Sequence, residues 1–263
     1  MAKKRIIPKL QLMPSKLNSG MMSLVTTVGF SKIIEIGSPV SQAKIYEAQA
    51  ADELIFIDLS PSKGLGSKDL LIDILREAAE EIFLPLTIGG GVSTVDDFRL
   101  LLQNGADKIS INTAALENPK LIQEASKLFG SQCVVVSIDY KLDEFGTPLV
   151  YSESGTKSHD LHPLEWAKMA QELGAGEILL TSIDHDGKSN GLELQISKQI
   201  CENVSIPVII SGGCGRAIDF VEGFKEAKAD AISAGTFFCF QDQNPMQTRG
   251  HIKNAGIDIR IHT

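Results

Sequence analysis

The chain has 263 residues, of which 43% are hydrophobic and 22% charged, as is ordinary for a globular core. Its length matches one (β/α)8 barrel, typically about 250 residues, so we expect a single domain over residues 1–263. A net charge of −8 and a pI near 5.2 argue against general nucleic-acid binding. No apolar run is long enough to span a bilayer, and the amino terminus lacks a signal-peptide core, so we expect a cytoplasmic protein that is not membrane-bound.

The four cysteines show no paired metal-ligand spacing, and three of them lie in or beside apolar runs. We therefore expect reduced, packed thiols at Cys133, Cys201, Cys214 and Cys239. No cluster of His, Cys and carboxylate residues has metal-ligand spacing either, so the sequence predicts no metal and no cofactor.

The chain begins with a strand over residues 5–12, although Pro8 counts against it because proline cannot donate to a sheet ladder. A long loop follows to about Pro39. Within it, residues 24–30 are apolar and β-branched, which favours a small hairpin over a barrel mouth. Further elements are expected as a helix over 41–50, a strand over 53–59 and a helix over 67–82.

A repeat dominates the pattern. Residues 84–113 read as strand, glycine-rich turn, helix and strand, and a similar stretch returns at 206–236. Between the copies we expect a helix over 118–129, a strand over 133–139, a polar loop over 140–161, a helix over 163–173, a strand over 177–182 and a helix over 193–204. The tail from Asn244 is polar and does not define the eighth helix.

Strands separated by helices indicate an α/β fold, a (β/α)8 TIM barrel built from two similar half-barrels, with an open sheet as the alternative.

Glycines at the carboxyl end of a strand expose backbone N–H groups, and the next helix offers its positive end to an anion. Each copy of the repeat also ends in a threonine. We therefore expect two phosphate sites, formed by Gly90, Gly91, Asn112 and Thr113 and by Gly212, Gly213, Gly235 and Thr236. Such a pair suits a substrate with a phosphate at each end.

Polar residues also gather at the carboxyl ends of strands, where barrels hold their active sites. They are Gln11, Asp58, Asp139, Thr181, Asp184 and Asp186. Asp139 follows an apolar strand and is the best candidate for acid–base work, with a turn cap as the alternative. His185 is interpreted as a solvated loop residue rather than a proton donor.

Four charged residues open strands at the opposite end, namely Arg5, Glu53, Lys108 and Glu177. In a closed barrel they converge on the floor. A salt-bridged plug is the simpler interpretation, and a gate for a small molecule moving along the axis is the other.

The chain resembles, over nearly its full length, the cyclase subunit of imidazole glycerol phosphate synthase, the HisF type. The resemblance rests on RII (5–7), ADELIFIDL (51–59), GGGV (89–92), NGADKISINTAALENP (104–119), FGSQCVVVSID (129–139), GAGEILLTSIDHDG (174–187) and SGGCG (211–215). It implies a barrel that docks a glutaminase on its amino-terminal face, near Asp107, and receives ammonia through the barrel. The four floor residues then match the gate, and the glycine and threonine residues match the phosphate sites.

Two departures bear on chemistry. The family uses aspartates at the ends of strands 1 and 5, and Asp139 matches the second, whereas Gln11 occupies the first position. An amide does not titrate near neutral pH, so Gln11 cannot shuttle a proton. Thr26 stands where the family has a loop lysine.

In these respects the chain is similar to a diverged acetamidino-modification branch, in which the barrel works with a glutaminase and an ATP-dependent sugar amidotransferase. The expected function is an ammonia-accepting subunit for amidino-sugar formation in surface glycans, acting on a phosphorylated small molecule. Alternatives are an authentic cyclase of histidine biosynthesis, a non-catalytic partner that activates a glutaminase, and a related phosphoribosyl isomerase, which would need no ammonia path.

Overall fold

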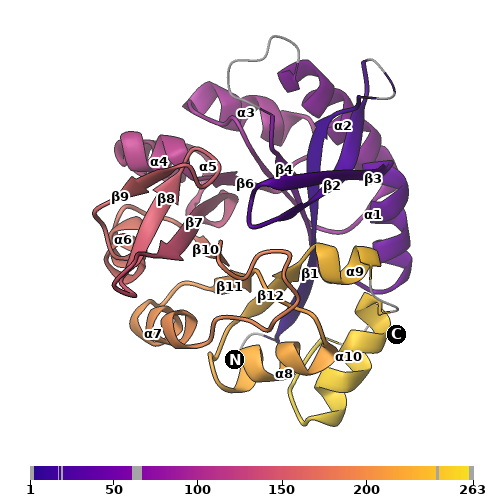
Figure 1. Ribbon diagram of the computed structural model, residues 1–263. Helices are drawn as coiled ribbons and strands as arrows, with labels where there is room; N and C mark the ends of the chain where they lie inside the picture. The colour runs from indigo at the N-terminus through magenta and orange to yellow at the C-terminus, as the bar shows by residue number, and fades with distance from the viewer. Residues whose placement is uncertain (1–2, 17, 19, 61–66, 241–242, 261–263) are drawn as a thin grey trace.

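The computed structural model describes residues 3–16, 18, 20–60, 67–240 and 243–260. Eight parallel strands follow the order β10-β11-β12-β1-β4-β5-β6-β7, and β10 also pairs with β7, which closes the ring. These strands are β1 (Arg5–Pro14), β4 (Leu54–Asp58), β5 (Leu86–Gly89), β6 (Lys108–Ile111), β7 (Val134–Leu142), β10 (Glu177–Ser182), β11 (Val208–Ser211) and β12 (Ala231–Ala234). Helices surround the ring (Figure 1), so the fold is the expected (β/α)8 TIM barrel.

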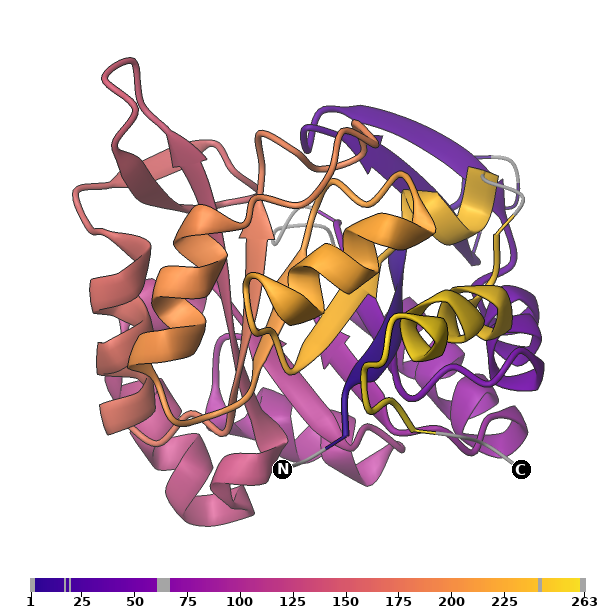
Figure 2. The same cartoon turned by 90° about the horizontal axis from the view of Figure 1, so that it is seen from below.

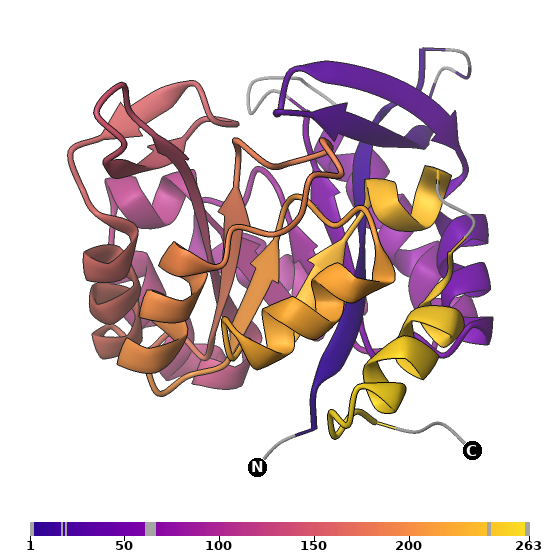
Figure 3. The ribbon, with the colours of Figure 1, turned by 60° about the horizontal axis from the view of Figure 1, so that its bottom comes forward.

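The helices are α1 (Pro39–Ala48), α2 (Ser67–Glu81), α3 (Val95–Gln103), α4 (Thr113–Glu117), α5 (Lys120–Phe129), α6 (Pro163–Glu172), α7 (Gln195–Asn203), α8 (Ala217–Lys225), α9 (Thr236–Phe240) and α10 (Pro245–Asn254), with a 3-10 turn at Ser131–Cys133. The polar tail therefore does form a helix, α10. The Asn244 side chain accepts a hydrogen bond from the Gln247 N–H, and Pro245 occupies the first turn. Figure 3 shows α10 packed beside α8.

In both copies of the repeat, an aspartate caps the start of the helix. In α3, the Asp97 carboxylate accepts hydrogen bonds from the N–H groups of Ser93 and Thr94. In α8, Asp219 does the same for Gly215 and Arg216. A carboxylate that satisfies free N–H groups at a helix start also interacts favourably with the helix dipole. The repeated aspartate thus fixes how each glycine-rich turn enters its helix.

The barrel has two cores. The larger one lies between the sheet and the helices, and a smaller one fills the barrel axis. The smaller core consists of Ile7, Ile55, Val135, Leu179, Ile209 and Ala231. Because side chains alternate along a strand, the residues two before and two after these also point inward. Polar residues on the barrel strands therefore sort into a floor and a mouth separated by an apolar layer.

Pro8 lies inside β1, against the expectation drawn from its missing N–H. Residues Arg5–Pro8 pair with β12, whereas Lys9–Leu12 pair with β4. The pairing of β1 with β12 ends at Pro8, and its pairing with β4 begins at the next residue. The missing N–H of Pro8 therefore falls between the two sets of strand hydrogen bonds. Figure 3 shows β1 running from the floor of the barrel to the hairpin above its mouth.

Two antiparallel extensions rise at the carboxyl-terminal end of the barrel (Figure 2). One is the expected hairpin, β2 (Met22–Val28) and β3 (Lys32–Gly37). The other replaces the polar loop expected over 140–161. There β7 continues to Leu142 and pairs with β8 (Pro148–Ser152), which pairs with β9 (Lys157–His159). The loop prediction was wrong because Leu149 to Tyr151 continue the strand pairing and Asp143 caps a tight turn at Phe145 and Thr147.

Candidate functional sites at the two ends of the barrel

The four charged residues at the floor form a closed ring of ion pairs. Arg5 contacts Glu53 at 2.7 Å and Glu177 at 2.5 Å. Lys108 contacts Glu53 at 2.8 Å and Glu177 at 2.9 Å. Each carboxylate thus bridges two cations, and each cation bridges two carboxylates. The sequence prediction that these residues converge on the axis is confirmed in geometry.

The ring holds its members in their charged forms. Burial alone would lower the pKa of the Arg5 guanidinium and of the Lys108 ammonium, but Glu177 and Glu53 raise both above their ordinary values. Burial alone would likewise raise the pKa of the Glu53 carboxyl, and Arg5 and Lys108 lower it instead. The floor is therefore a fixed, charge-balanced layer below the apolar one.

The mouth of the barrel holds a cation that the sequence reasoning missed. Arg5 and Ile7 point inward from β1, and the same alternation places Lys9 and Gln11 inside the upper barrel. The signal was present in RIIPKLQL, whose odd positions combine two cations and an amide with one apolar residue. Lys9 is only 8% exposed.

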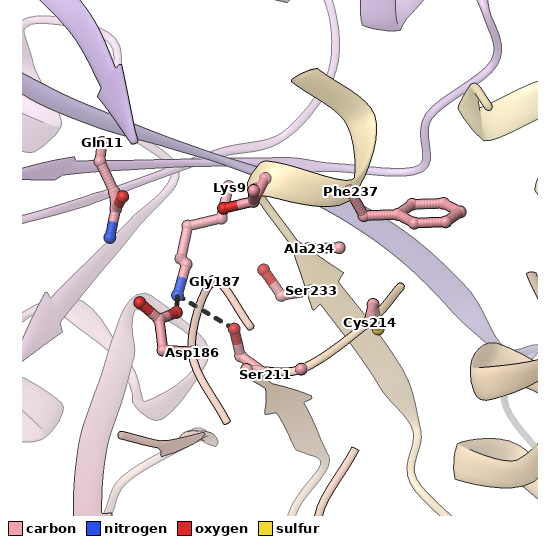
Figure 4. A pocket seen from close by; sticks show the side chains of 13 residues that line it. Lys9, Gln11, Asp186, Gly187, Ser211, Cys214, Ser233, Ala234 and Phe237 are labelled. Carbon is pink, nitrogen blue, oxygen red and sulfur yellow. Dashed lines mark hydrogen bonds and ion pairs between the residues drawn. The ribbon is translucent and has the colours of Figure 1, made fainter. Parts of the chain in front are cut away.

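The Lys9 ammonium reaches across the upper barrel. Its Nζ donates a hydrogen bond to Ser211 Oγ at 3.0 Å and lies 3.7 Å from Asp186 Oδ1. Figure 4 shows this side chain extended toward both partners. Lys9 and Asp186 therefore form an ion pair between the first strand and the loop after β10.

Gln11 is tied to that same loop through the hairpin. Its Nε2 donates to Thr27 Oγ1 at 3.0 Å, and Thr27 Oγ1 donates to Asp186 Oδ2 at 3.0 Å. Gly187 follows, and a Cβ there would lie 2.2 Å from the Thr27 carbonyl oxygen, so glycine allows the close approach. Thr27 is thus the hairpin residue that joins the polar network of the mouth. Thr26, which stands where the family has a loop lysine, is buried on β2.

Asp139 lies at the mouth on β7 and accepts a hydrogen bond from Asn112 Nδ2 at 2.8 Å. Burial raises the pKa of its carboxyl to about 6; Lys9 opposes this and Asp186 adds to it. Ser137 and Thr181 donate to the carboxylate and also oppose the rise. A carboxylate of this pKa can exchange protons near neutral pH, which is what a general base requires.

The second glycine-rich site lies over Lys9. We call the space there the mouth pocket; it is lined by Lys9, Gln11, Asp186, Gly187, Ser211, Gly212, Gly213, Cys214, Ser233, Ala234, Gly235, Thr236 and Phe237. All four residues predicted for this phosphate site therefore line one pocket. The ends of β11 and β12 place them together with the polar residues of β1.

The first glycine-rich site is placed at the ends of β5 and β6. A Cβ at Gly90 would lie 2.1 Å from the Asp58 carbonyl oxygen, so this turn presses on the neighbouring strand. Asn112 contacts Asp139, and Thr113 Oγ1 accepts a hydrogen bond from the Glu153 N–H. The Asn112 Oδ1 atom is buried without a hydrogen-bond partner among the described residues.

Other predicted residues have local contacts. Asp184 accepts from the Leu142 N–H at 2.9 Å and so braces the β7–β8 extension. His185 is half-buried and shares a hydrogen bond with Ser182 at 2.9 Å, which corrects its interpretation as a solvated residue. Asp58 binds the Ser60 N–H as a turn cap, and burial raises its pKa. Asp107 is exposed at the floor and accepts from the Leu86 N–H.

All four cysteines are free. Within the described ranges, no group of three or more His, Cys, Asp or Glu residues is arranged to hold a metal ion. Over the same ranges, the protein has no helix of the length and apolarity that crossing a bilayer requires.

A closed ring of parallel strands with ion pairs on its floor and a polar pocket at its mouth places the chain in the class of (β/α)8 barrels. The family model described as "Histidine biosynthesis protein" matches residues 5–243. A protein of Prochlorococcus marinus named "Putative imidazole glycerol phosphate synthase subunit hisF2" is 45% identical, over 99% of both chains. The HisF subunit of the same synthase is 42% identical in Anoxybacillus flavithermus and in Lactococcus lactis, over 99% of this chain and 100% and 98% of those proteins.

The chain belongs to the HisF family of imidazole glycerol phosphate synthase subunits.

Proposed function

We propose that this chain is the ammonia-accepting subunit of a HisF-type synthase complex. A glutaminase docks on the floor, and ammonia passes the ring of Arg5, Glu53, Lys108 and Glu177 toward the mouth. The observation that carries this proposal is the closed ring itself, which sits on the axis below an apolar layer. The relatives' names also describe subunits of a synthase, which implies a partner chain.

The apolar layer supports the same route. Neutral ammonia can cross a region lined by Ile7, Ile55, Val135, Leu179 and Ile209, whereas the hydrated ammonium ion would lose its water there. The exposed Asp107 beside Lys108 is then part of the glutaminase contact.

For the nitrogen acceptor, we propose an acetamido sugar whose amide oxygen is activated by an ATP-dependent partner, so that ammonia attacks the amide carbon, an acetamidine forms and the oxygen leaves with phosphate. Two features of the mouth support a reaction other than ring closure. Gln11 is committed to a hydrogen bond with Thr27 and carries no titratable proton, and Thr26 supplies no cation. Asp139 remains the base, and the glycine-rich turns hold the phosphorylated end of the acceptor.

The second candidate is cyclisation itself, as in histidine biosynthesis. Asp139 is at the mouth with a pKa of about 6, and the names of the relatives favour this activity. In this case Asp139 would act as the acid–base group without a carboxylate on β1.

A cyclisation assay separates the two candidates. Purified chain is supplied with ammonium and the formimino-ribulosyl substrate of the family. We expect turnover at least a hundredfold below an ordinary enzyme rate of about 1 per second, because one acid–base group is missing. Gln11→Asp should raise that turnover by about a hundredfold or more, and Gln11→Asn is the matched control.

Wild-type turnover of about 1 per second or faster would overturn amidation and establish cyclisation. A Gln11→Asp variant no faster than Gln11→Asn would show that the missing carboxylate is not what limits ring closure.

A further inference from the structure

The buried cation at Lys9 is not accounted for by the ring, by Asp139 or by the glycine-rich turns. Its side chain is 7% exposed. An ammonium has three N–H donors, and among the residues that the structure describes one acceptor lies within hydrogen-bonding distance, Ser211 Oγ at 3.0 Å. Asp186 Oδ1, at 3.7 Å, is beyond that distance. Lys9 is therefore a buried cation that has more N–H donors than acceptors among the described residues.

Ser233 provides a second and independent observation. It lies on β12, is 0% exposed, and lines the same pocket as Lys9. Its hydroxyl has no hydrogen-bond partner among the described residues. Buried polar atoms are normally paired, so an unpaired hydroxyl facing a pocket marks a position for a ligand atom.

We propose that Lys9, with Ser211 and Ser233, is a specificity-determining set of side chains beneath the phosphate site expected at Gly212, Gly213, Gly235 and Thr236. Lys9 adds a cation to that site from inside the barrel, and Ser233 adds a hydroxyl group. A phosphate there gives Lys9 its missing acceptor and Ser233 its missing partner. The phosphate oxygens also accept hydrogen bonds from backbone N–H groups, which can approach closely because these turns are glycine-rich.

Among the described residues, the lining of the mouth pocket holds one cation, Lys9, and one carboxylate, Asp186, so an entering phosphate takes the rest of its stabilisation from hydroxyl and backbone N–H groups. Lys9 faces Asp186 directly and Asp139 at longer range. Asp186 already accepts a hydrogen bond from Thr27 through its other oxygen, so Lys9 is not its sole partner. Gln11, which lines the pocket as a neutral amide, adds no further negative charge against an entering phosphate. An aspartate at that position would add one.

The competing interpretation is structural: the Lys9–Asp186 pair would only tie β1 to the loop after β10. Both interpretations allow Lys9→Met, which keeps the length and apolar stem of the side chain, to lower the ligand-free melting temperature, because it leaves the buried Asp186 carboxylate without its cation. They differ in the response to phosphate. An anion-binding Lys9 predicts that the variant loses most of the phosphate-induced rise in melting temperature, and a purely structural Lys9 predicts that it keeps the full rise.

The experiment is a titration with inorganic phosphate, at constant ionic strength set with sodium chloride. Binding is measured by calorimetry, and the melting temperature is recorded with and without phosphate. The variants are Lys9→Met, Ser233→Ala and the control Lys188→Met, which removes an exposed cation from the same loop that carries Asp186. Ser233→Ala removes only one hydroxyl group, so it tests the same site if Lys9→Met does not fold.

We expect phosphate to stabilise the wild type, and Lys9→Met to weaken phosphate binding about tenfold to a hundredfold and to lose most of the phosphate-induced rise in melting temperature. Ser233→Ala should weaken it about threefold to tenfold, and Lys188→Met should not change it.

Three results would overturn the proposal. One is that the wild type does not bind phosphate. The second is that Lys9→Met and Ser233→Ala bind it as the wild type does. The third is that Lys9→Met melts lower without phosphate but keeps the full phosphate-induced rise. The inference rests on the proposed function only in treating the anion as part of the substrate. Because the titration needs neither glutaminase nor turnover, its failure is separate from a failure of ammonia transfer.

Discussion

Asp139 is a buried carboxylate, and burial affects both its pKa and the stability of the fold. Its pKa of about 6 lies above the ordinary value of 3.8, chiefly because of burial. The folded protein therefore keeps this proton to higher pH than the unfolded chain does. Ionising Asp139 costs folding stability as the pH rises from about 4 to about 6, and the full cost is present at pH 7.

This residue yields a test that needs no substrate. Asp139→Asn should raise the free energy of unfolding by about 1–3 kcal/mol at pH 7 and by about 0 at pH 4, where Asp139 is protonated in the folded state. Urea denaturation at both pH values measures the difference. The Asn112 contact survives, since an asparagine oxygen still accepts from Nδ2. An equal change at both pH values would show that burial does not raise this pKa.

Single residues also show what the sequence could and could not predict at the site. Arg5, Glu53, Lys108 and Glu177 were predictable because each opens a strand, and a closed barrel gathers strand openings on its axis. Lys9 was equally predictable from the alternation of side chains along β1. It was missed because the prediction considered only strand ends, and Lys9 lies two positions below the mouth. The pairing of Gln11 with Thr27 could not be foreseen, because it depends on how the β2–β3 hairpin folds back over the barrel.

At the scale of elements, the charged ring joins β1, β4, β6 and β10 across the floor. Its members stabilise the fold in a window set by their pKa shifts. Glu53 has a pKa below its ordinary 4.5, so its contribution is present above that value and is lost as the pH falls through the lowered pKa. Lys108 has a pKa above its ordinary 10.5, so its contribution is present below that value and is lost as the pH rises through the raised pKa.

Breaking the ring should therefore be costly between about pH 5 and pH 10. Glu53→Gln leaves Arg5 and Lys108 each with one carboxylate, Glu177, and should destabilise by about 3 kcal/mol at pH 7. The double variant Glu53→Gln/Lys108→Met should cost less than the sum of the single changes, because the two side chains contact each other at 2.8 Å. Urea unfolding measures all three; strict additivity would show that these ion pairs are not coupled.

The elements themselves differ in how far local sequence determined them. Barrel strands were predictable from continuous apolar runs such as Val134–Val136, and the repeated Asp97 and Asp219 mark the same helix start twice. The β7–β9 extension was missed because β8 is short, PLVYS, and β9 is the polar tripeptide KSH, so that only the pairing with β7 identifies them as strands. Helix α10 was missed for a similar reason, since its buried side consists of isolated residues such as Ile252.

At the scale of the whole molecule, the barrel separates two tasks. The floor is a charge-balanced ring, and the mouth is a polar pocket with a buried carboxylate, one buried cation and glycine-rich turns. The apolar layer lies between the charged floor and the polar mouth. The proposed function assigns the floor to a glutaminase and the mouth to the nitrogen acceptor. In this account, nitrogen enters at one end and is incorporated at the other, whichever acceptor the mouth holds.

The measurement that tests this most directly follows the nitrogen itself. The chain, its glutaminase and its acceptor are supplied with glutamine carrying 15N in the amide, in the presence of an excess of unlabelled ammonium. We predict that the product carries mostly 15N in the wild type, and that Lys108→Ala, which opens the ring, lets the label fall toward the ratio in solution. A wild-type product already at the solution ratio would contradict an internal path through this barrel.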